Sequence, residues 1–138
     1  MIKQPILMVV PPKSSGIDVI ARIAVKEKEG NSIILTYKVE QVLQGIYQEL
    51  CNSSIAYKRT DDGIQYSTGS MKTISVHKIT MSTWGVEVGS DIQSLFIHNV
   101  DLIHPKITQR LIYNKTCDVI MTSKTVIDED FDVDIISE

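Results

Sequence analysis

The clearest hydrophobic pattern in the chain lies between Val39 and Leu50, where apolar residues recur three and four positions apart. Most of the positions between them are glutamate or glutamine, so a helix here would have one apolar and one polar side. This spacing predicts an amphipathic helix over about residues 37–51. Gly45 lies inside it and costs a helix about 1 kcal/mol relative to alanine, so we expect another backbone to approach closely there.

The other apolar segments have the period of strands. Apolar and polar residues alternate from Ile17 to Val25, and this period of two is typical of a half-buried strand. The Asp62-Gly63 pair predicts the turn of a hairpin, because it tolerates positive φ. Further strands are expected over residues 5–10, 33–35, 71–88, 91–103, 108–113 and 118–127.

Composition also favours a sheet. The 138 residues include 21 Ile and 13 Val against 7 Leu, and β-branched side chains fit a pleated strand better than a helix. We therefore predict one α+β domain over residues 1–127, with a twisted, mainly antiparallel sheet and the amphipathic helix packed on one face. Within it, residues 1–16 would form an N-terminal arm. Residues 128–138 would form an acidic C-terminal tail or an edge strand.

Charge is distributed unevenly along the chain. Residues 1–126 carry all 14 Lys and Arg against 11 acids, whereas residues 127–138 carry six acids and no base. The body lacks the concentrated basic stripe of a DNA reader, so any binding to nucleic acid or an anionic surface is expected to be weak. No apolar run approaches the ~20 residues of a membrane helix. We expect an intracellular soluble protein, located in the host cytoplasm or the virion if it is viral.

The residues with the most reactive side chains form no recognisable motif. His98 and Asp101 would point to opposite faces of a strand, and His104 would lie far beyond them, which argues against a metal or acid–base site. The two cysteines are too few for a disulfide framework and are interpreted as free thiols. The Ser67–Ser70 run lacks the Gly-Lys-Ser/Thr ending of a phosphate-binding loop and is interpreted as a turn. We predict no catalytic residue, no metal and no cofactor.

Two terminal segments are predicted to mediate contacts with other proteins. In the tail, apolar and acidic residues alternate, which suits an edge strand or a peptide that adds to a partner's sheet. The predicted partner-binding residues are Asp130, Phe131, Asp132, Val133, Asp134, Ile135 and Ile136. The predicted self-association arm consists of Pro5, Ile6, Leu7, Met8, Val9 and Val10.

The order of the expected elements resembles the globular domain of rhabdovirus matrix proteins. The resemblance rests on the alternating strand Ile17–Lys28, the Thr36-Tyr37 pair before the helix, and a late strand at Cys117–Ile127 followed by acids. It implies a protein that condenses nucleocapsids, self-associates and binds anionic membranes. Pro11-Pro12-Lys13-Ser14 lacks the tyrosine of the Pro-Pro-x-Tyr motif that such proteins carry.

These observations favour a non-enzymatic, matrix-like assembly protein that self-associates and docks protein partners, with a homo-oligomer expected. Two alternatives are kept. One is a small enzyme or ligand-binding domain with a site assembled from distant residues such as His77, Asp91, His98 and Arg110. The other is a weak nucleic-acid-binding accessory protein whose acidic tail is autoinhibitory.

Overall fold

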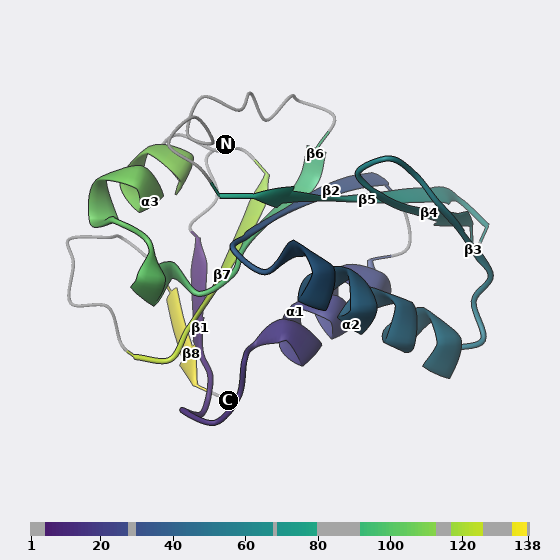
Figure 1. Cartoon of the computed structure of the whole chain (residues 1–138). Coiled ribbons are helices and arrows are strands. Elements are labelled where there is room, and N and C mark those ends of the chain that lie inside the picture. The colour runs from purple at the N-terminus through teal and green to yellow at the C-terminus, as the bar shows by residue number, and fades with distance from the viewer. Residues whose placement is uncertain are drawn as a thin grey trace.

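The computed structural model describes residues 5–27, 30–67, 69–79, 92–112 and 117–125, and the backbone of residues 134–137. Figure 1 shows how its helices and strands are arranged. In chain order the elements are β1 (Ile6–Val9), α1 (Ile17–Lys26), β2 (Gly30–Thr36), α2 (Val39–Asn52), β3 (Tyr57–Arg59), β4 (Gly63–Ser67), β5 (Met71–Lys78), β6 (Ile92–Ile97), η2 (Val100–Leu102), α3 (Pro105–Ile112), β7 (Asp118–Ser123) and β8 (Asp134–Ser137).

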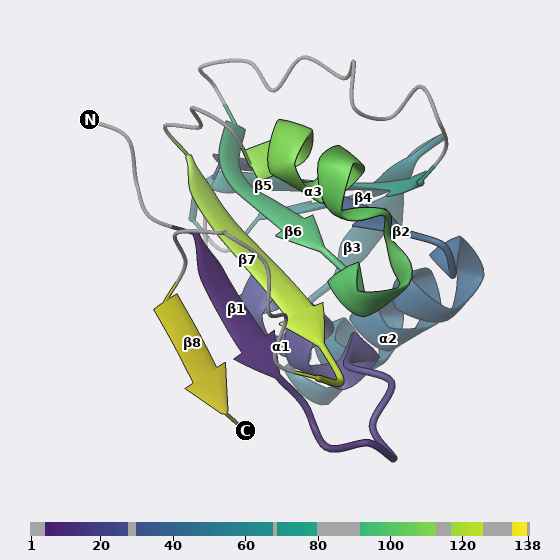
Figure 2. The same ribbon diagram turned by 90° about the vertical axis from the view of Figure 1, so that its left-hand side faces the viewer.

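The described strands form one sheet in the order β3-β4-β5-β2-β6-β7-β1-β8. All neighbours from β5 to β8 in that order run parallel, and only β3–β4 and β4–β5 are antiparallel. Figure 2 shows β6, β7, β1 and β8 side by side. The prediction of an α+β fold with a mainly antiparallel sheet is therefore wrong, and the fold is α/β. Ser32–Thr36 of β2 are all buried, which is typical of a parallel strand covered on both faces.

The segment predicted as a strand from Ile17 is the helix α1. Its buried residues recur at helical spacing as well as in alternation, because Ile20, Ala21, Ala24 and Val25 lie on one side. The alternation of apolar and polar residues in this segment therefore fits a helix as well as a strand. Packing selects the helix, because these residues are buried in the core that α1 forms with α2 and the sheet. Of the amides in α1, the Ile17 amide donates to Ser15 Oγ at 3.4 Å.

The helix predicted over about residues 37–51 is observed as α2, which packs against α1. A Cβ atom on Gly45 would lie 2.8 Å from Cγ2 of Ile17. A close approach is thus observed at Gly45, but it is made by the Ile17 side chain in the first turn of α1, whereas the Ile17 carbonyl oxygen lies 3.9 Å from the Cβ position. Side chains larger than hydrogen at this position would push the two helices apart.

The strand predicted over residues 108–113 is also wrong, because residues 108–112 belong to α3. The helix begins at Pro105, where a proline's fixed φ suits the first helical position and its missing N–H is not needed. His104 Nδ1 accepts a hydrogen bond of 3.1 Å from the Lys106 amide. The β3–β4 hairpin, in contrast, lies where the Asp62-Gly63 turn predicts it.

The helices divide between the two faces of the sheet. One core packs α1 and α2 against Ile34, Ile74 and Phe96 of the sheet. The other packs η2 and α3 against Leu7, Leu35 and other apolar strand residues. Figure 1 shows α3 on the opposite side of the sheet from α1 and α2. Within the described ranges, none of the helices is long and apolar enough to cross a membrane.

Candidate functional site

The ends of the parallel strands bring several polar segments together. β2 and β6 are neighbours in the sheet. β2 is followed by α2 on one face and leads toward β3, whereas β6 is followed by η2 and α3 on the other face and leads to β7. In α/β proteins, ligands usually bind at the carboxyl ends of the strands where neighbouring connections diverge in this way. We call this region the carboxyl edge. It comprises residues 10–18, 36–38, 98–101 and 122–125.

The loop between β1 and α1 forms one wall of the carboxyl edge. The Ser14 amide donates to the Pro11 carbonyl oxygen at 2.9 Å, and the Gly16 amide donates to Ser14 Oγ at 3.1 Å. Gly16 has a φ of 77°, and a Cβ there would lie 3.3 Å from Thr122 Oγ1. Glycine therefore suits this position both through its backbone conformation and through the close approach of β7.

His98 links this loop to the end of β2. The side chain is 1% exposed, and its Nε2 donates to the Ser15 carbonyl oxygen at 2.5 Å. Its Nδ1 lies 2.8 Å from Thr36 Oγ1, which also accepts a hydrogen bond from the Lys38 amide. Because a carbonyl oxygen can only accept, Nε2 carries the proton and the Thr36 hydroxyl donates to Nδ1.

This arrangement favours a neutral imidazole. Burial lowers the pKa of His98 from its ordinary value of 6.5, and the positive charges of Lys38 and Lys124 lower it further. The hydrogen bond to Ser15 and the charge of Asp101 act in the opposite direction. The hydrogen-bond pattern agrees with the lowered pKa, because a second ring proton would leave the Thr36 hydroxyl without its acceptor.

The carboxyl edge presents more positive than negative side chains to solvent. Lys13, Lys38 and Lys124 are exposed and lie on three separate loops. The acids of these loops are Asp18 in the first turn of α1 and the half-buried Asp101. Asp101 Oδ1 accepts a hydrogen bond of 3.4 Å from the Lys124 amide. An excess of lysines beside the amino end of α1 favours an anionic ligand.

Asn99 forms part of the floor of this region. It follows His98 with a φ of 55°, and its amide donates to Thr122 Oγ1 at 3.1 Å. The residue is 4% exposed, and its Oδ1 is one of two buried side-chain polar atoms in the described residues without a hydrogen-bond partner. A buried acceptor left without a partner costs about 1–3 kcal/mol, which makes Oδ1 available to a ligand or a water.

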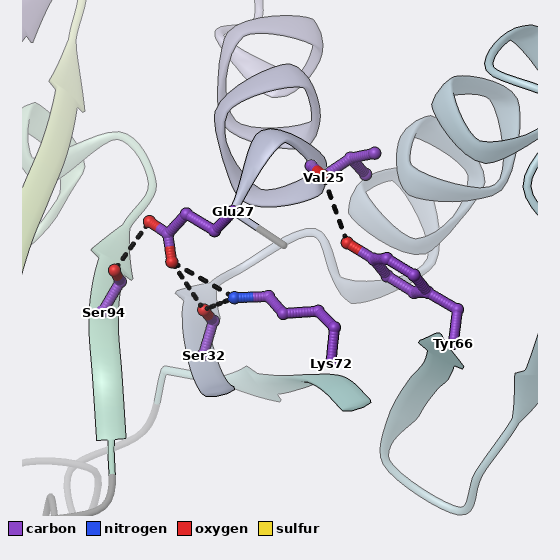
Figure 3. A network of polar contacts seen from close by, with 6 residues as sticks. All are labelled: Val25, Glu27, Ser32, Tyr66, Lys72 and Ser94. Atoms are coloured by element: carbon purple, nitrogen blue, oxygen red, sulfur yellow. Dashed lines mark hydrogen bonds and ion pairs between the residues drawn. The ribbon is translucent and has the colours of Figure 1, made fainter. Parts of the chain in front are cut away.

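A second polar cluster lies toward the amino ends of β2, β5 and β6 and is shown in Figure 3. Lys72 Nζ donates to Glu27 Oε2 at 3.1 Å and to Ser32 Oγ at 2.6 Å. Ser94 Oγ donates to Glu27 Oε1 at 2.6 Å. We call these four residues the amino-edge cluster. Both carboxylate oxygens and the ammonium group have partners within the protein, so the cluster ties the end of α1 to three strands.

Burial governs the ionisation of this second cluster. It lowers the pKa of Lys72, while the charge and the hydrogen bond of Glu27 act to raise it. The nearby Tyr66 hydroxyl donates to the Val25 carbonyl oxygen at 3.3 Å, and burial, followed by the charge of Glu27, raises its pKa to about 12. Charges held in pairs in this way leave little for a ligand to bind, and removing one partner would leave the other charge without compensation.

Of the described residues that the sequence offered as one distant site, His98 lies in the carboxyl edge, whereas His77 and Arg110 lie on β5 and α3. His98 lies in the carboxyl edge with Asp101 nearby, whereas His104 lies at the start of α3. His77 is on β5, 3.7 Å from Asp62. Arg110 is on α3, and Asp91 lies outside the described residues. In the part of the chain that is described, no three His, Cys, Asp or Glu side chains converge as metal ligands would.

The predicted self-association arm and the described part of the predicted partner-binding tail form the last two strands of the sheet, β1 and β8. Ile6–Val9 form β1, which pairs with β7 on one side and β8 on the other, and Pro5, Leu7 and Val10 are buried. Asp134, Ile135 and Ile136 belong to β8 at the sheet's edge. Asp130, Phe131, Asp132 and Val133 lie outside the described residues. Roles of these segments in self-association and partner binding stay predictions.

The sequence predicts a loop through Gly16, but sequence reasoning gave this loop no functional role. The missed signal is an apolar strand followed by Lys13, two serines and a glycine, and then by a helical apolar pattern from Ile17. Interpreting residues 17–25 as a strand concealed this strand–loop–helix order. The Ser67–Ser70 run, which the sequence offered as the nearest approach to a phosphate loop, lies instead at the β4–β5 connection.

Comparison with known proteins finds solved structures that have a similar fold. No known family model matches the sequence, and no curated protein matches it either. Solved structures of the large terminase from a thermophilic bacteriophage do match, with 10% sequence identity. One has a TM-score of 0.69 and covers 99% of this chain and 39% of the terminase. The complex with ATP-gamma-S has a TM-score of 0.68 with the same coverage, and the ADP complex 0.67 with 99% and 40%.

The likeness is one of fold. This chain spans about two fifths of the length of the matched terminase chains. The terminase fold and the parallel sheet overturn the resemblance to rhabdovirus matrix proteins, and with it the interpretation as a non-enzymatic, matrix-like assembly protein. They agree better with the alternative of a small enzyme or ligand-binding domain whose site is assembled from distant residues.

Proposed function

We propose that the carboxyl edge binds the phosphate groups of a nucleotide. The observation that carries the proposal is the strand–loop–helix unit formed by β1, Ser14-Ser15-Gly16 and α1, whose loop is joined by His98 to the end of β2. Helix amino ends and the backbone before them bind phosphate readily, because their N–H groups and dipole face the anion. The large terminase with a similar fold has been solved with ADP and with ATP-gamma-S.

The lysines supply the second part of the argument. Lys13 precedes the two serines, Lys38 follows β2, and Lys124 follows β7. The charges of Lys38 and Lys124 both act on His98, and His98 contacts the loop through Ser15. A phosphate at the amino end of α1 would therefore lie among positive charges from separate loops, and a charged hydrogen bond to it would contribute roughly 1.5–3 kcal/mol.

Titration calorimetry with ADP and with ATP-gamma-S tests this proposal. We expect both nucleotides to bind, and Lys13→Ala to weaken binding by about tenfold, which corresponds to about 1.4 kcal/mol. The matched control is Lys58→Ala, because Lys58 is an exposed lysine on β3 at the opposite end of the strand order. It should bind as the natural chain does. An equal loss in both variants, or no heat of binding at millimolar nucleotide, would reject the site.

A further inference from the structure

His98 joins segments that lie far apart in the sequence. Its ring nitrogens bond Ser15, 83 residues earlier, and Thr36, 62 residues earlier. Its backbone amide donates to the Leu35 carbonyl oxygen at 2.9 Å, so the residue continues the pairing of β6 with β2. Because strand pairing fixes the backbone of His98, the ring extends toward the loop before α1 from a rigid part of the sheet.

The two ring nitrogens fix the orientation of the ring. Nδ1 accepts a hydrogen bond from the Thr36 hydroxyl, whose oxygen in turn accepts a hydrogen bond of 2.9 Å from the Lys38 amide. A half-turn of the ring would place carbon atoms opposite Thr36 and Ser15. The Thr36 hydroxyl is fully buried and would then be left without its acceptor, which is unfavourable. The bond to Thr36 therefore keeps Nε2 directed at the loop.

The bond from Nε2 controls the direction of the peptide group between Ser15 and Gly16. In a planar trans peptide, the C=O and N–H groups point in opposite directions. Because the Ser15 carbonyl oxygen points at the buried ring, the Gly16 amide points away from it and donates to Ser14 Oγ at 3.1 Å. Turning this peptide group over would present the negative end of its dipole to an anion on the outer side of the loop.

Packing holds the loop against the same ring. A Cβ atom on Gly16 would lie 3.7 Å from His98 Cδ2 and 3.5 Å from Thr122 Cβ. Both of these side chains are buried, and they extend from the neighbouring strands β6 and β7. The loop therefore rests on side chains fixed by the sheet, and His98 adds a polar contact to this packing.

We propose that His98 is a positioning residue for the ligand of the carboxyl edge, because it holds the Ser15 carbonyl oxygen inward and so keeps the Ser14-Ser15-Gly16 backbone in its binding conformation. This role rests on the proposed nucleotide site and adds a residue that acts through the loop without touching the ligand. Both ring nitrogens bond the protein, but only Nε2 bonds the loop. The two nitrogens should therefore differ in their effect on ligand affinity.

Two amide variants separate the two ring nitrogens. The side-chain nitrogen of glutamine is as many bonds from Cβ as histidine Nε2, so His98→Gln can still donate to the Ser15 carbonyl oxygen. The side-chain nitrogen of asparagine corresponds in the same way to Nδ1, so His98→Asn can contact Thr36 but cannot reach Ser15. Both variants lose the packing of the ring. A purely structural role of the ring would therefore affect ADP binding in both variants alike.

The experiment is a calorimetric titration of the natural chain and both variants with ADP at neutral pH. We expect His98→Asn to bind about tenfold more weakly than the natural chain, a loss of about 1.4 kcal/mol, and His98→Gln to bind within about twofold of it. Equal affinities in the two variants, or a loss confined to His98→Gln, would overturn the role of His98 and leave the nucleotide site standing. Absence of binding by the natural chain would overturn both.

NMR relaxation of the backbone amides gives a second readout that requires no ligand. The order parameters of Ser15 and Gly16 should be typical of rigid backbone, about 0.85, in the natural chain and in His98→Gln, and clearly lower in His98→Asn. Lys72→Met is the control for lost stability, because Lys72 belongs to the amino-edge cluster, and it should change neither these values nor the ADP affinity. A loop that stays equally rigid in His98→Asn would contradict the assigned contact.

Discussion

The two polar regions of the sheet differ in where their charges find partners. In the amino-edge cluster, Lys72 is fully buried and its ammonium group bonds Glu27 and Ser32. At the carboxyl edge, the buried members are neutral, as His98 illustrates, and the lysines lie in solvent. Removing one member of a buried ion pair is strongly destabilising because it leaves the other charge without a partner, whereas exposed charges remain available to a ligand. The comparison therefore assigns stability to one edge and binding to the other.

The largest effect should come from breaking the amino-edge cluster. Lys72→Met removes one partner of a buried ion pair and leaves Glu27 without it, while retaining much of the apolar stem. We expect the free energy of unfolding to fall by about 2–4 kcal/mol, toward the lower part of the usual range because Glu27 is partly exposed. Urea unfolding measures the change. A loss of less than about 1 kcal/mol, or a weakened ADP affinity in the folded variant, would contradict the division between the edges.

A pair of glycine variants separates the effect of backbone strain on stability from the effect of an added side chain on ADP binding. Gly16→Ala and Gly69→Ala both place a side chain at positive φ, with values of 77° and 111°. Each should cost about 1–2 kcal/mol of stability. Only at position 16 does the new Cβ meet Thr122 and His98, so only Gly16→Ala should also weaken ADP binding. Equal ADP affinity in the two variants would show that this loop does not contact the ligand.

Acid pH should act on the carboxyl edge through His98. Because its pKa in the folded chain is lowered from 6.5, the unfolded chain takes up a proton first as the pH falls below that value. The stability that His98 contributes is therefore complete above pH 6.5 and is lost as the pH falls toward the folded-state pKa. The slope is at most about 1.4 kcal/mol per pH unit.

Urea unfolding of the natural chain and of His98→Gln from neutral to acid pH measures this effect. The difference in stability between the two chains should shrink as the pH falls, because glutamine does not titrate. The groups that act on His98 are Lys38, Lys124 and Asp101, together with the Ser15 carbonyl. His104→Gln, at the exposed start of α3, controls for the loss of a histidine in general. A constant difference across the range would argue against a buried, neutral His98.

The smallest effect concerns salt. Raising the ionic strength from about 0.01 M to about 0.1 M shortens the screening length from about 30 Å to about 10 Å. Affinity for ADP should fall severalfold, because the lysines of the carboxyl edge are exposed. The stability difference between the natural chain and Lys72→Met should hardly change, since buried pairs are screened less. An ADP affinity that does not change with salt, together with a stability difference that does, would contradict the assignment of binding to the carboxyl edge and of paired charges to the amino edge.

The sequence predicts α2 well because its apolar residues follow a single period. It does not distinguish a strand from a helix over Ile17–Val25, where the apolar positions satisfy both periods and the packing against α2 and the sheet comes from distant parts of the chain. Parallel pairing was not predictable, because β1 pairs with β7, more than a hundred residues away, and no local pattern encodes this. His98 was named as one of four distant candidates, but its contact with Ser15 depends on the tertiary arrangement of these strands.

The most direct test of the account is an NMR titration of the isotopically labelled chain with ADP, followed through its backbone amide signals. The account predicts shifts at residues 13–17, 36–38, 98–101 and 122–125, which come from four separate segments of the carboxyl edge. The signals of Ser32, Lys72 and Ser94 in the amino-edge cluster should stay in place. Shifts confined to the amino-edge cluster or to the β3–β4 hairpin, or none at saturating ADP, would contradict it.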